Sequence, residues 1–252
     1  MSQIPEATAE IQEQIEPDAV RERVATVRRR IEEACRTANR DPSEITIVAV
    51  SKTFPMQSIA AGVASGLVHF GENRARELRD KEKARPGRMH GGDVIWRFIG
   101  HLQTNKAKYI ARHADWFDAL DSPRVAEALD ERAAKNDRVL SCLVQVNISG
   151  ADQKYGLPPE DVHTFLDNCA DYPHLHVHGL MAMASFTENP EDVRPQFRRM
   201  KELFDGYDAT DNPRVDMEEL SLGMSNDFEV AIEEGSTMIR LGSSIFGPRQ
   251  YD

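Results

Sequence analysis

The chain has 252 residues, 40% of them hydrophobic and 29% charged, which is ordinary for a globular protein with one large domain or two small ones. Its net charge of −11 argues against nonspecific binding to nucleic acid or to an anionic membrane. No apolar run approaches the roughly 20 residues of a membrane span. Residues 1–17 are acidic and polar and lack the apolar segment of a secretory signal, so we expect a disordered tail before a single domain of residues 18–252. The three cysteines show no metal or redox spacing, and the cytoplasm is the expected compartment.

Apolar periodicity predicts a long amino-terminal helix followed by alternating strands and helices. In residues 18–40 the apolar side chains recur at helical spacing opposite an Arg- and Glu-rich face. The predicted strands are residues 45–50, 67–70, 94–99, 116–120, 139–148, 175–181, 219–222 and 237–241. The other predicted helices are residues 56–65, 74–84, a segment that residues 100–106 open, 123–135, 158–169, 190–204 and 227–234.

Eight strand-then-helix units of about 25 residues each favour an α/β fold of the (β/α)8 barrel type with an extra amino-terminal helix. An open doubly wound sheet would usually carry a Gly-rich phosphate turn after its first strand. The sequence there is instead Ser-Lys-Thr-Phe-Pro, at residues 51–55. No linker divides the predicted barrel.

The first predicted strand leads directly to a lysine. Because side chains alternate along a strand, Val48, Val50 and Lys52 share one face, and Pro55 prevents the strand from continuing. An ammonium at the carboxyl end of a buried strand is costly unless it is paired or has a lowered pKa that serves chemistry. The alternative is a lysine whose head group extends to solvent.

Active sites of such barrels lie at the carboxyl ends of the strands. The predicted ends hold Lys52, Asn73, Gly100, Asp121, Asn147, Met181, Gly223-Met224-Ser225 and Gly242-Ser243. The last two groups follow strands 7 and 8, where a phosphate site recurs in this fold. Gly223 permits close backbone approach, and Ser243 offers a hydroxyl and an N–H group. These loops together favour a phosphate site, although ordinary caps and turns would use the same residues.

Helix caps are predicted at two of these loops. Ser122 stands before Pro123 as a helix cap. Ser225 or Asn226 is expected to cap the helix at residues 227–234, and Asn226 with Glu229 has the spacing of a capping box.

Arg240 is the second charged residue expected inside the barrel mouth. It shares a face of the last strand with Met238, two residues before the Gly242-Ser243 turn. A buried lysine, an inward arginine and a phosphate site fit pyridoxal 5′-phosphate (PLP), with Lys52 as the Schiff-base lysine and Arg240 facing the pyridine nitrogen. A guanidinium there weakens the cofactor as an electron sink. A salt bridge from Arg240 to a barrel carboxylate is the structural alternative.

Other chemistry has weaker support in the sequence. Alternating histidines that could bind a metal lie near the start of strand 6, whereas hydrolase ligands belong at the carboxyl ends; packed or solvated histidines are the alternative. They are His174, His176 and His178. Asp118 and Asp121 could form an acid–base pair, although Asp121 could equally help to cap a helix. Cys142 lies mid-strand without a partnered histidine, so it is not expected to be a nucleophile.

Several motifs resemble those of the pyridoxal phosphate homeostasis proteins, single-barrel relatives of the alanine racemase amino-terminal domain. They are Ala49-Val-Ser-Lys52-Thr, Phe70-Gly-Glu-Asn73, Trp96-Arg-Phe-Ile-Gly-His-Leu-Gln-Thr-Asn-Lys106, Gly179-Leu-Met-Ala-Met183, Leu222-Gly-Met-Ser225-Asn-Asp227 and Arg240-Leu-Gly-Ser-Ser-Ile-Phe-Gly247. The similarity runs from about residue 20 to the carboxyl terminus. Arg97 departs from it, because the family usually has histidine there.

The resemblance implies a PLP-binding barrel that acts in vitamin B6 homeostasis without established turnover. The residues expected to bind PLP are Lys52, Asn73, Met224, Ser225, Arg240, Gly242 and Ser243, with no catalytic or metal-binding residue. PLP-dependent apoenzymes are candidate partners. The alternatives are a PLP-dependent racemase or decarboxylase and, more weakly, a metal-dependent barrel hydrolase.

In racemase-like enzymes a carboxyl-terminal β-domain supplies the second acid–base group. The chain ends at Asp252, just after strand 8, so this domain and its dimer contact are expected to be absent and the protein to be mostly monomeric. None of the five tyrosines falls at the carboxyl end of a predicted strand. We therefore expect no amino-acid turnover at an enzymatic rate.

Overall fold

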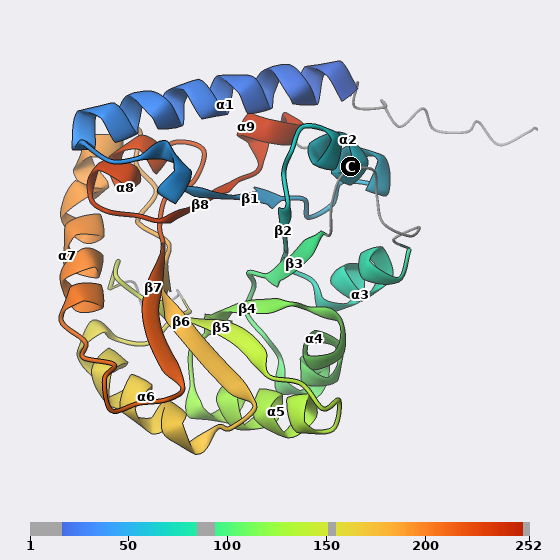
Figure 1. The fold of residues 1–252 in the computed structure, drawn as a ribbon, viewed down its shortest axis with the longest axis vertical. Coiled ribbons are helices and arrows are strands. Elements are labelled where there is room, and N and C mark those ends of the chain that lie inside the picture. Colours follow the sequence, from blue (N-terminus) through green and yellow to red (C-terminus); the bar gives the residue numbers. More distant parts are fainter. Residues whose placement is uncertain (1–16, 85–93, 151–154, 249–252) are drawn as a thin grey trace, which may run out of the picture.

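The computed structural model describes residues 17–84, 94–150 and 155–248, in which eight parallel strands form one closed barrel in the order β1 to β8 (Figure 1). The strands are β1 (Thr46–Val50), β2 (His69–Glu72), β3 (Ile95–Phe98), β4 (Trp116–Leu120), β5 (Leu140–Val146), β6 (Leu175–Ala182), β7 (Val215–Ser221) and β8 (Met238–Leu241). The predicted barrel is confirmed. The predicted tail lies outside the described residues, except that Pro17 already belongs to the first helix.

Helices surround the barrel, as the ribbon in Figure 1 shows. They are α1 (Pro17–Ala38), α2 (Met56–Ala64), α3 (Ala75–Lys83), α4 (Ala107–His113), α5 (Pro123–Ala134), α6 (Val162–Asn168), α7 (Arg194–Asp205), α8 (Phe228–Glu233) and α9 (Ser243–Phe246). Among these described helices, none combines the length and the apolar character needed to cross a membrane.

Helix α1 covers the place where the first and last strands meet. β1 pairs with β8, with Thr46 opposite Met238 and Ala49 opposite Leu241. The apolar stripe of α1 is buried, and the helix packs on α2, α8 and α9. Just beyond its end, Arg40 donates to the carbonyls of Ile232 (2.8 Å) and Ser236 (2.7 Å). The extra amino-terminal helix thus ties the beginning of the barrel to its last unit.

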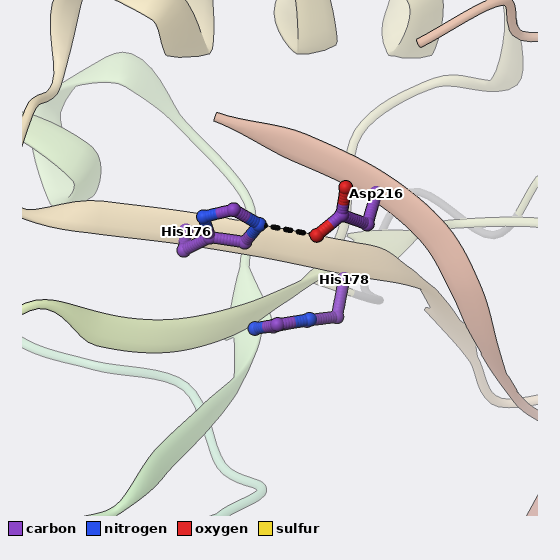
Figure 2. Close-up of side chains that lie close together, drawn as sticks. All are labelled: His176, His178 and Asp216. Atoms are coloured by element: carbon purple, nitrogen blue, oxygen red, sulfur yellow. Dashed lines mark hydrogen bonds and ion pairs between the residues drawn. The ribbon is translucent and has the colours of Figure 1, made fainter. Parts of the chain in front are cut away.

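β2 and β7 differ most from their predicted bounds. β2 begins and ends two residues later than predicted, and Gly71 within it leaves room for two side chains, since a Cβ there would lie 3.1 Å from both Ile99 Cδ1 and Val48 Cγ1. β7 begins at Val215, four residues before the predicted start. Its pairing with β6 is irregular, because Val177 opposes Val215 whereas Gly179 opposes Glu219. The bulge brings Asp216 beside His176 of β6 (Figure 2).

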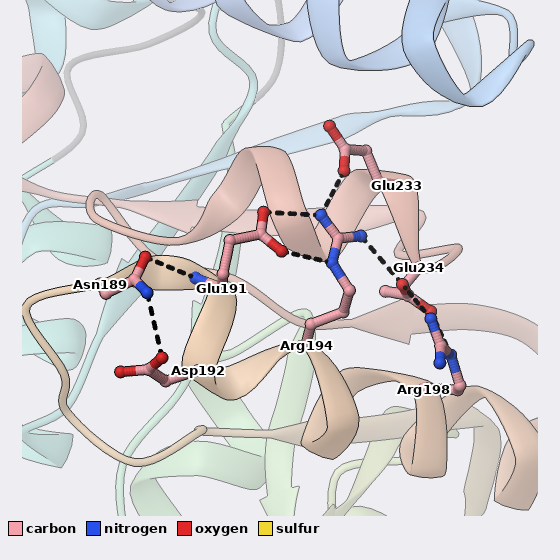
Figure 3. A network of polar contacts seen from close by, with 7 residues as sticks. All are labelled: Asn189, Glu191, Asp192, Arg194, Arg198, Glu233 and Glu234. Carbon is pink, nitrogen blue, oxygen red and sulfur yellow. Dashed lines mark hydrogen bonds and ion pairs between the residues drawn. The ribbon is translucent and has the colours of Figure 1, made fainter.

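An ionic cluster joins the helices that follow β6 and β7. Arg194, at the start of α7, binds Glu191 (2.7 Å) beside it, and reaches Glu233 (2.6 Å) and Glu234 (2.9 Å) at the end of α8 (Figure 3). Because one guanidinium serves three carboxylates, this cluster fixes α7 against α8 more firmly than an isolated surface pair would.

The predicted caps are only partly right. Ser122 does occupy the position before α5, but its side chain makes no capping bond, and its hydroxyl donates to Asp121 Oδ1 at 3.4 Å. The capping box of Asn226 is wrong, because α8 begins at Phe228 with Asp227 as the preceding residue. The Asn226 amide instead donates to the Thr187 carbonyl at 3.1 Å.

Candidate functional site

The residues predicted to bind a cofactor gather at one end of the barrel. Lys52 follows β1, Asn73 follows β2, and the 223–225 and 242–243 segments follow β7 and β8. Because all strands are parallel, these positions share the carboxyl-terminal rim. Phe54 packs against Phe246 of α9 with ring centroids 5.1 Å apart, so the loop of Lys52 contacts the helix after Gly242.

A buried ionic cluster holds the residue before Lys52. The Ser51 hydroxyl donates to Glu72 Oε1 at 2.6 Å. Lys81 reaches across from α3 and donates to the Ser51 carbonyl (2.8 Å) and to the same Glu72 oxygen (2.7 Å). Ser51 and Glu72 are fully buried, and Lys81 is nearly so. This cluster was not predicted from the sequence, because residues 74–84 were predicted only as a helix, with no partner for Lys81.

The residue after Lys52 is held by the same cluster. Glu77 accepts from Lys81 at 2.8 Å and from the Thr53 backbone N–H at 2.6 Å. Thr53 has φ +70°, which is unusual for a β-branched residue and costs free energy that the surrounding bonds must offset. Lys52 therefore extends from a backbone segment that is fixed on both sides.

The two carboxylates of the cluster have opposite pKa shifts. Burial raises the pKa of Glu72 to about 7, although the Lys81 ammonium and the Ser51 hydroxyl act against this rise. Burial also acts on Glu77, but its hydrogen bonds from Lys81 and the Thr53 N–H outweigh it and lower its pKa. Glu72 is thus a carboxyl of this rim whose pKa lies near neutral pH.

Small residues and hydroxyls form the rim beside β7 and β8. Gly223 has φ +86°, and a Cβ there would lie 2.7 Å from Ala231 Cβ, so only glycine fits this turn against α8. The Ser225 hydroxyl accepts from the Ser244 N–H at 3.4 Å, which joins the two loops. Met224 is exposed, and its N–H donates to the buried Asp227 carboxylate at 2.6 Å.

Arg240 lies under this rim, and its guanidinium is almost fully buried. It donates to the Ser221 carbonyl (2.8 Å), the Ser221 hydroxyl (2.6 Å) and the Ala182 carbonyl (2.8 Å). Ser221 and Ala182 are the last residues of β7 and β6. Within the described chain Arg240 has no ion pair, so the predicted alternative of a salt bridge is wrong. Burial lowers its pKa to about 10, and it remains cationic at neutral pH.

Deeper in the barrel, Arg97 and Asp118 form a fully buried ion pair, with 2.7 Å between Arg97 Nε and Asp118 Oδ2. The guanidinium also lies 4.0 Å from the Trp116 ring centroid. The suggested acid–base pair of Asp118 and Asp121 is therefore wrong, because Asp121 contacts His101 instead, at 3.4 Å. The sequence does indicate this ion pair, because Arg97 and Asp118 are single opposite charges in two consecutive apolar strands.

The alternating histidines of β6 do not act as a set of three. His176 Nε2 donates to Asp216 Oδ2 at 2.6 Å, and His178 Nε2 lies 3.2 Å from the Ser141 hydroxyl (Figure 2). His174 stands apart, 3.5 Å from an Asp130 carboxylate oxygen. All three lie toward the amino-terminal end of the barrel, opposite Lys52, as the sequence predicts. They therefore take no part in the site at the rim.

Comparison with known protein families identifies the class of protein to which this chain belongs. The family described as "Alanine racemase, N-terminal domain" matches residues 15–250, so the barrel and its rim are those of this class. Two proteins named "Pyridoxal phosphate homeostasis protein" are similar over most of their length. The one from Aquifex aeolicus is 40% identical over 91% of this chain and 98% of its own, and the one from Escherichia coli is 39% identical over 90% and 96%.

A solved structure extends the comparison. PipY of Synechococcus elongatus, determined with PLP bound, has a TM-score of 0.76 and 30% sequence identity, covering 90% of this chain and 100% of that one. The chain belongs to the pyridoxal phosphate homeostasis protein family, which confirms the resemblance seen in the motifs.

Proposed function

We propose that this chain binds PLP at the carboxyl-terminal rim of its barrel, covalently through Lys52, and acts in cellular PLP homeostasis. One observation carries the proposal. The residues on both sides of Lys52 are held by hydrogen bonds, Ser51 by Lys81 and Thr53 by Glu77. The same segment packs on the helix that begins with the serine turn after β8. Lys52 can therefore attach an aldehyde close to the serine turn that would bind a phosphate.

The residues at the rim fit a phosphate-bearing group. The donors are neutral hydroxyls and N–H groups of Ser225, Gly242 and Ser243, which suit a dianion. Arg240 adds a buried positive charge whose three acceptors are all neutral oxygens. The Asp227 carboxylate at this rim already accepts from the Met224 N–H. Asn73 and Met224 are exposed beside the rim and would line the opening.

When bound, PLP supplies an aldehyde that condenses reversibly with an amine and absorbs visible light. Every other contribution comes from the chain itself. The Ser51, Thr53 and Lys81 contacts orient Lys52, and the hydroxyls at the β7 and β8 loops hold the phosphate. Arg240 would supply a fixed positive charge to the pyridine nitrogen of the bound group, which would disfavour protonation of that nitrogen.

We further propose that the protein does not turn over amino acids at an enzymatic rate, and that it works as a monomer in the cytoplasm, passing PLP to apoenzymes. Arg240 supports the first point, because a cation at the ring nitrogen removes the electron-withdrawing character that racemases and decarboxylases use. The homeostasis name of the relatives points the same way.

A PLP-dependent racemase or decarboxylase remains the second candidate because of one pair of side chains. His101, after β3, stacks on Tyr155 at a centroid distance of 3.8 Å. Tyr155 lies in the loop after β5, and its carbonyl accepts from Gln145 near the end of that strand at 3.0 Å, so this tyrosine lies on the same side of the barrel as Lys52. An imidazole and a phenol are suitable acid–base groups.

The test of covalent binding is borohydride reduction of PLP-loaded protein followed by peptide mass mapping. We expect one phosphopyridoxyl group on the peptide that contains Lys52, and loss of the visible band in Lys52→Ala. Lys106→Ala is the matched control, since Lys106 is a half-buried lysine elsewhere on the rim side, and it should behave like the parent. Labelling of any other lysine contradicts the assignment.

Turnover is tested separately with the same loaded protein and a panel of amino acids. We expect racemisation, decarboxylation and transamination rates far below about 1 s⁻¹, the low end of the ordinary enzyme range. A Lys52-dependent rate at or above this value, reduced in Tyr155→Phe, would establish the enzyme instead.

A further inference from the structure

A group of metal-ligating side chains lies at the end of the barrel opposite Lys52. His176 and His178 come from β6 and Asp216 from β7 (Figure 2). One ligand atom from each residue can be chosen so that all three lie within 4.8 Å of one another. The function proposed above uses none of these residues.

The backbone explains why the three side chains meet. Residues two apart on a strand point to the same face, so His176 and His178 project together from β6, with ring centroids 4.6 Å apart. The third ligand depends on the irregular pairing of β7 with β6 between Val177 and Gly179, which turns Asp216 toward His176. Gly179 makes this bulge possible, because a Cβ there would lie 2.0 Å from the Glu219 carbonyl oxygen.

The imidazoles are oriented in the way that metal-binding histidines usually are. His178 Nε2 is engaged by the Ser141 hydroxyl at 3.2 Å, which leaves Nδ1 to bind an ion. The Trp116 ring packs on the same imidazole at a centroid distance of 4.6 Å and limits its rotation.

The charge around the cluster suits a cation. Asp216 supplies a carboxylate, and Glu218 adds a second negative charge on the same strand. The positive charge of Arg97 is balanced by its ion pair with Asp118. A site of two imidazoles and one carboxylate has the composition of known three-ligand zinc sites.

We propose that His176, His178 and Asp216 bind one Zn²⁺ ion, with water as the fourth ligand. Tetrahedral zinc with bonds of about 2.0–2.1 Å holds its ligand atoms about 3.3 Å apart, so small side-chain rotations suffice to close the site. The ion takes the place of the hydrogen between His176 Nε2 and Asp216 Oδ2, and the coordinated imidazole carries its one proton on Nδ1. The bound ion joins β6 to β7 at the end of the barrel that serves stability rather than catalysis.

The experiment is calorimetric titration of the full chain with ZnCl₂, first without PLP and then with it. We expect one ion per chain, a higher unfolding temperature with zinc, and an affinity that PLP does not change. Asp216→Asn and His178→Ala should each weaken zinc binding at least tenfold. The matched control is His174→Ala, a histidine of the same strand outside the cluster, which should bind zinc like the parent.

Three further measurements separate a loss of zinc binding from a loss of folding. Unfolding temperatures without metal show whether a variant is folded, and a Ser141→Ala variant, which keeps all three ligands, should lose about 10–100-fold in affinity. X-ray absorption of the zinc-loaded protein should show two imidazole ligands. Absence of binding at millimolar zinc, or unchanged affinity in folded Asp216→Asn and His178→Ala, would overturn the proposal without touching the PLP site.

Discussion

Glu72 allows a sharp test of the cluster that holds Lys52 in place. In Glu72→Gln the side chain keeps its shape and can still accept from Ser51, but it no longer ionises. A carboxyl with a pKa of 4.5 in the unfolded chain and about 7 in the folded one contributes stability that is fully present below pH 4.5 and lost as pH rises through 7. The loss amounts to about 2.5 kcal/mol between pH 5 and pH 8.

The assay is urea denaturation of parent and variant at pH 5, 6, 7 and 8. The parent should lose about 2.5 kcal/mol of unfolding free energy relative to Glu72→Gln across this range. Glu77→Gln is the control: since the pKa of Glu77 is lowered, its contribution is lost only as pH falls below its ordinary range, and the difference should be nearly flat. A parent that instead gains stability over Glu72→Gln with rising pH would show that the Lys81 ion pair outweighs burial.

Two further predictions concern the rim and the barrel interior. Ser225→Ala should weaken PLP by about tenfold or more, the cost of one charge-assisted hydrogen bond of about 1.5–3 kcal/mol, while dephosphorylated pyridoxal should bind almost as before; equal losses would exclude a phosphate contact. Arg97→Met leaves the buried Asp118 charge unpaired and should cost about 3–5 kcal/mol of unfolding free energy, whereas Arg97→Met/Asp118→Leu should recover most of it. A loss of under about 1 kcal/mol of unfolding free energy in Arg97→Met alone would refute this account of the pair.

The order of the elements was predictable because strands buried on both faces have continuous apolar runs. β4 was predicted to the residue, since Trp116–Leu120 has only one charge and a cap signal directly follows. β7 was missed over its first four residues, because Asp216 and Glu218 are charged and exposed. Their strand conformation depends on pairing with β6, which no local pattern reveals.

The rim residues could be predicted from their positions at strand ends, whereas the contacts that hold them could not. Glu77 and Lys81 have the helical spacing of a surface pair, and nothing local indicates that Lys81 turns inward to Ser51. The caps failed for a similar reason. Asn226 has good capping chemistry, but its side-chain amide donates to the Thr187 carbonyl of another loop, and α8 begins at Phe228 with Asp227 before it.

The seam between the first and last strands has a consequence for how the protein is made. β1 leaves the ribosome early, yet its partner β8 and the Ile232 and Ser236 carbonyls that Arg40 binds come almost 200 residues later. Until then one edge of β1 lacks its partner strand, and the part of α1 that packs on α8 and α9 is uncovered. Nascent chains stalled before residue 238 should therefore be captured by chaperones that recognise exposed strand edges, and release should coincide with synthesis of β8.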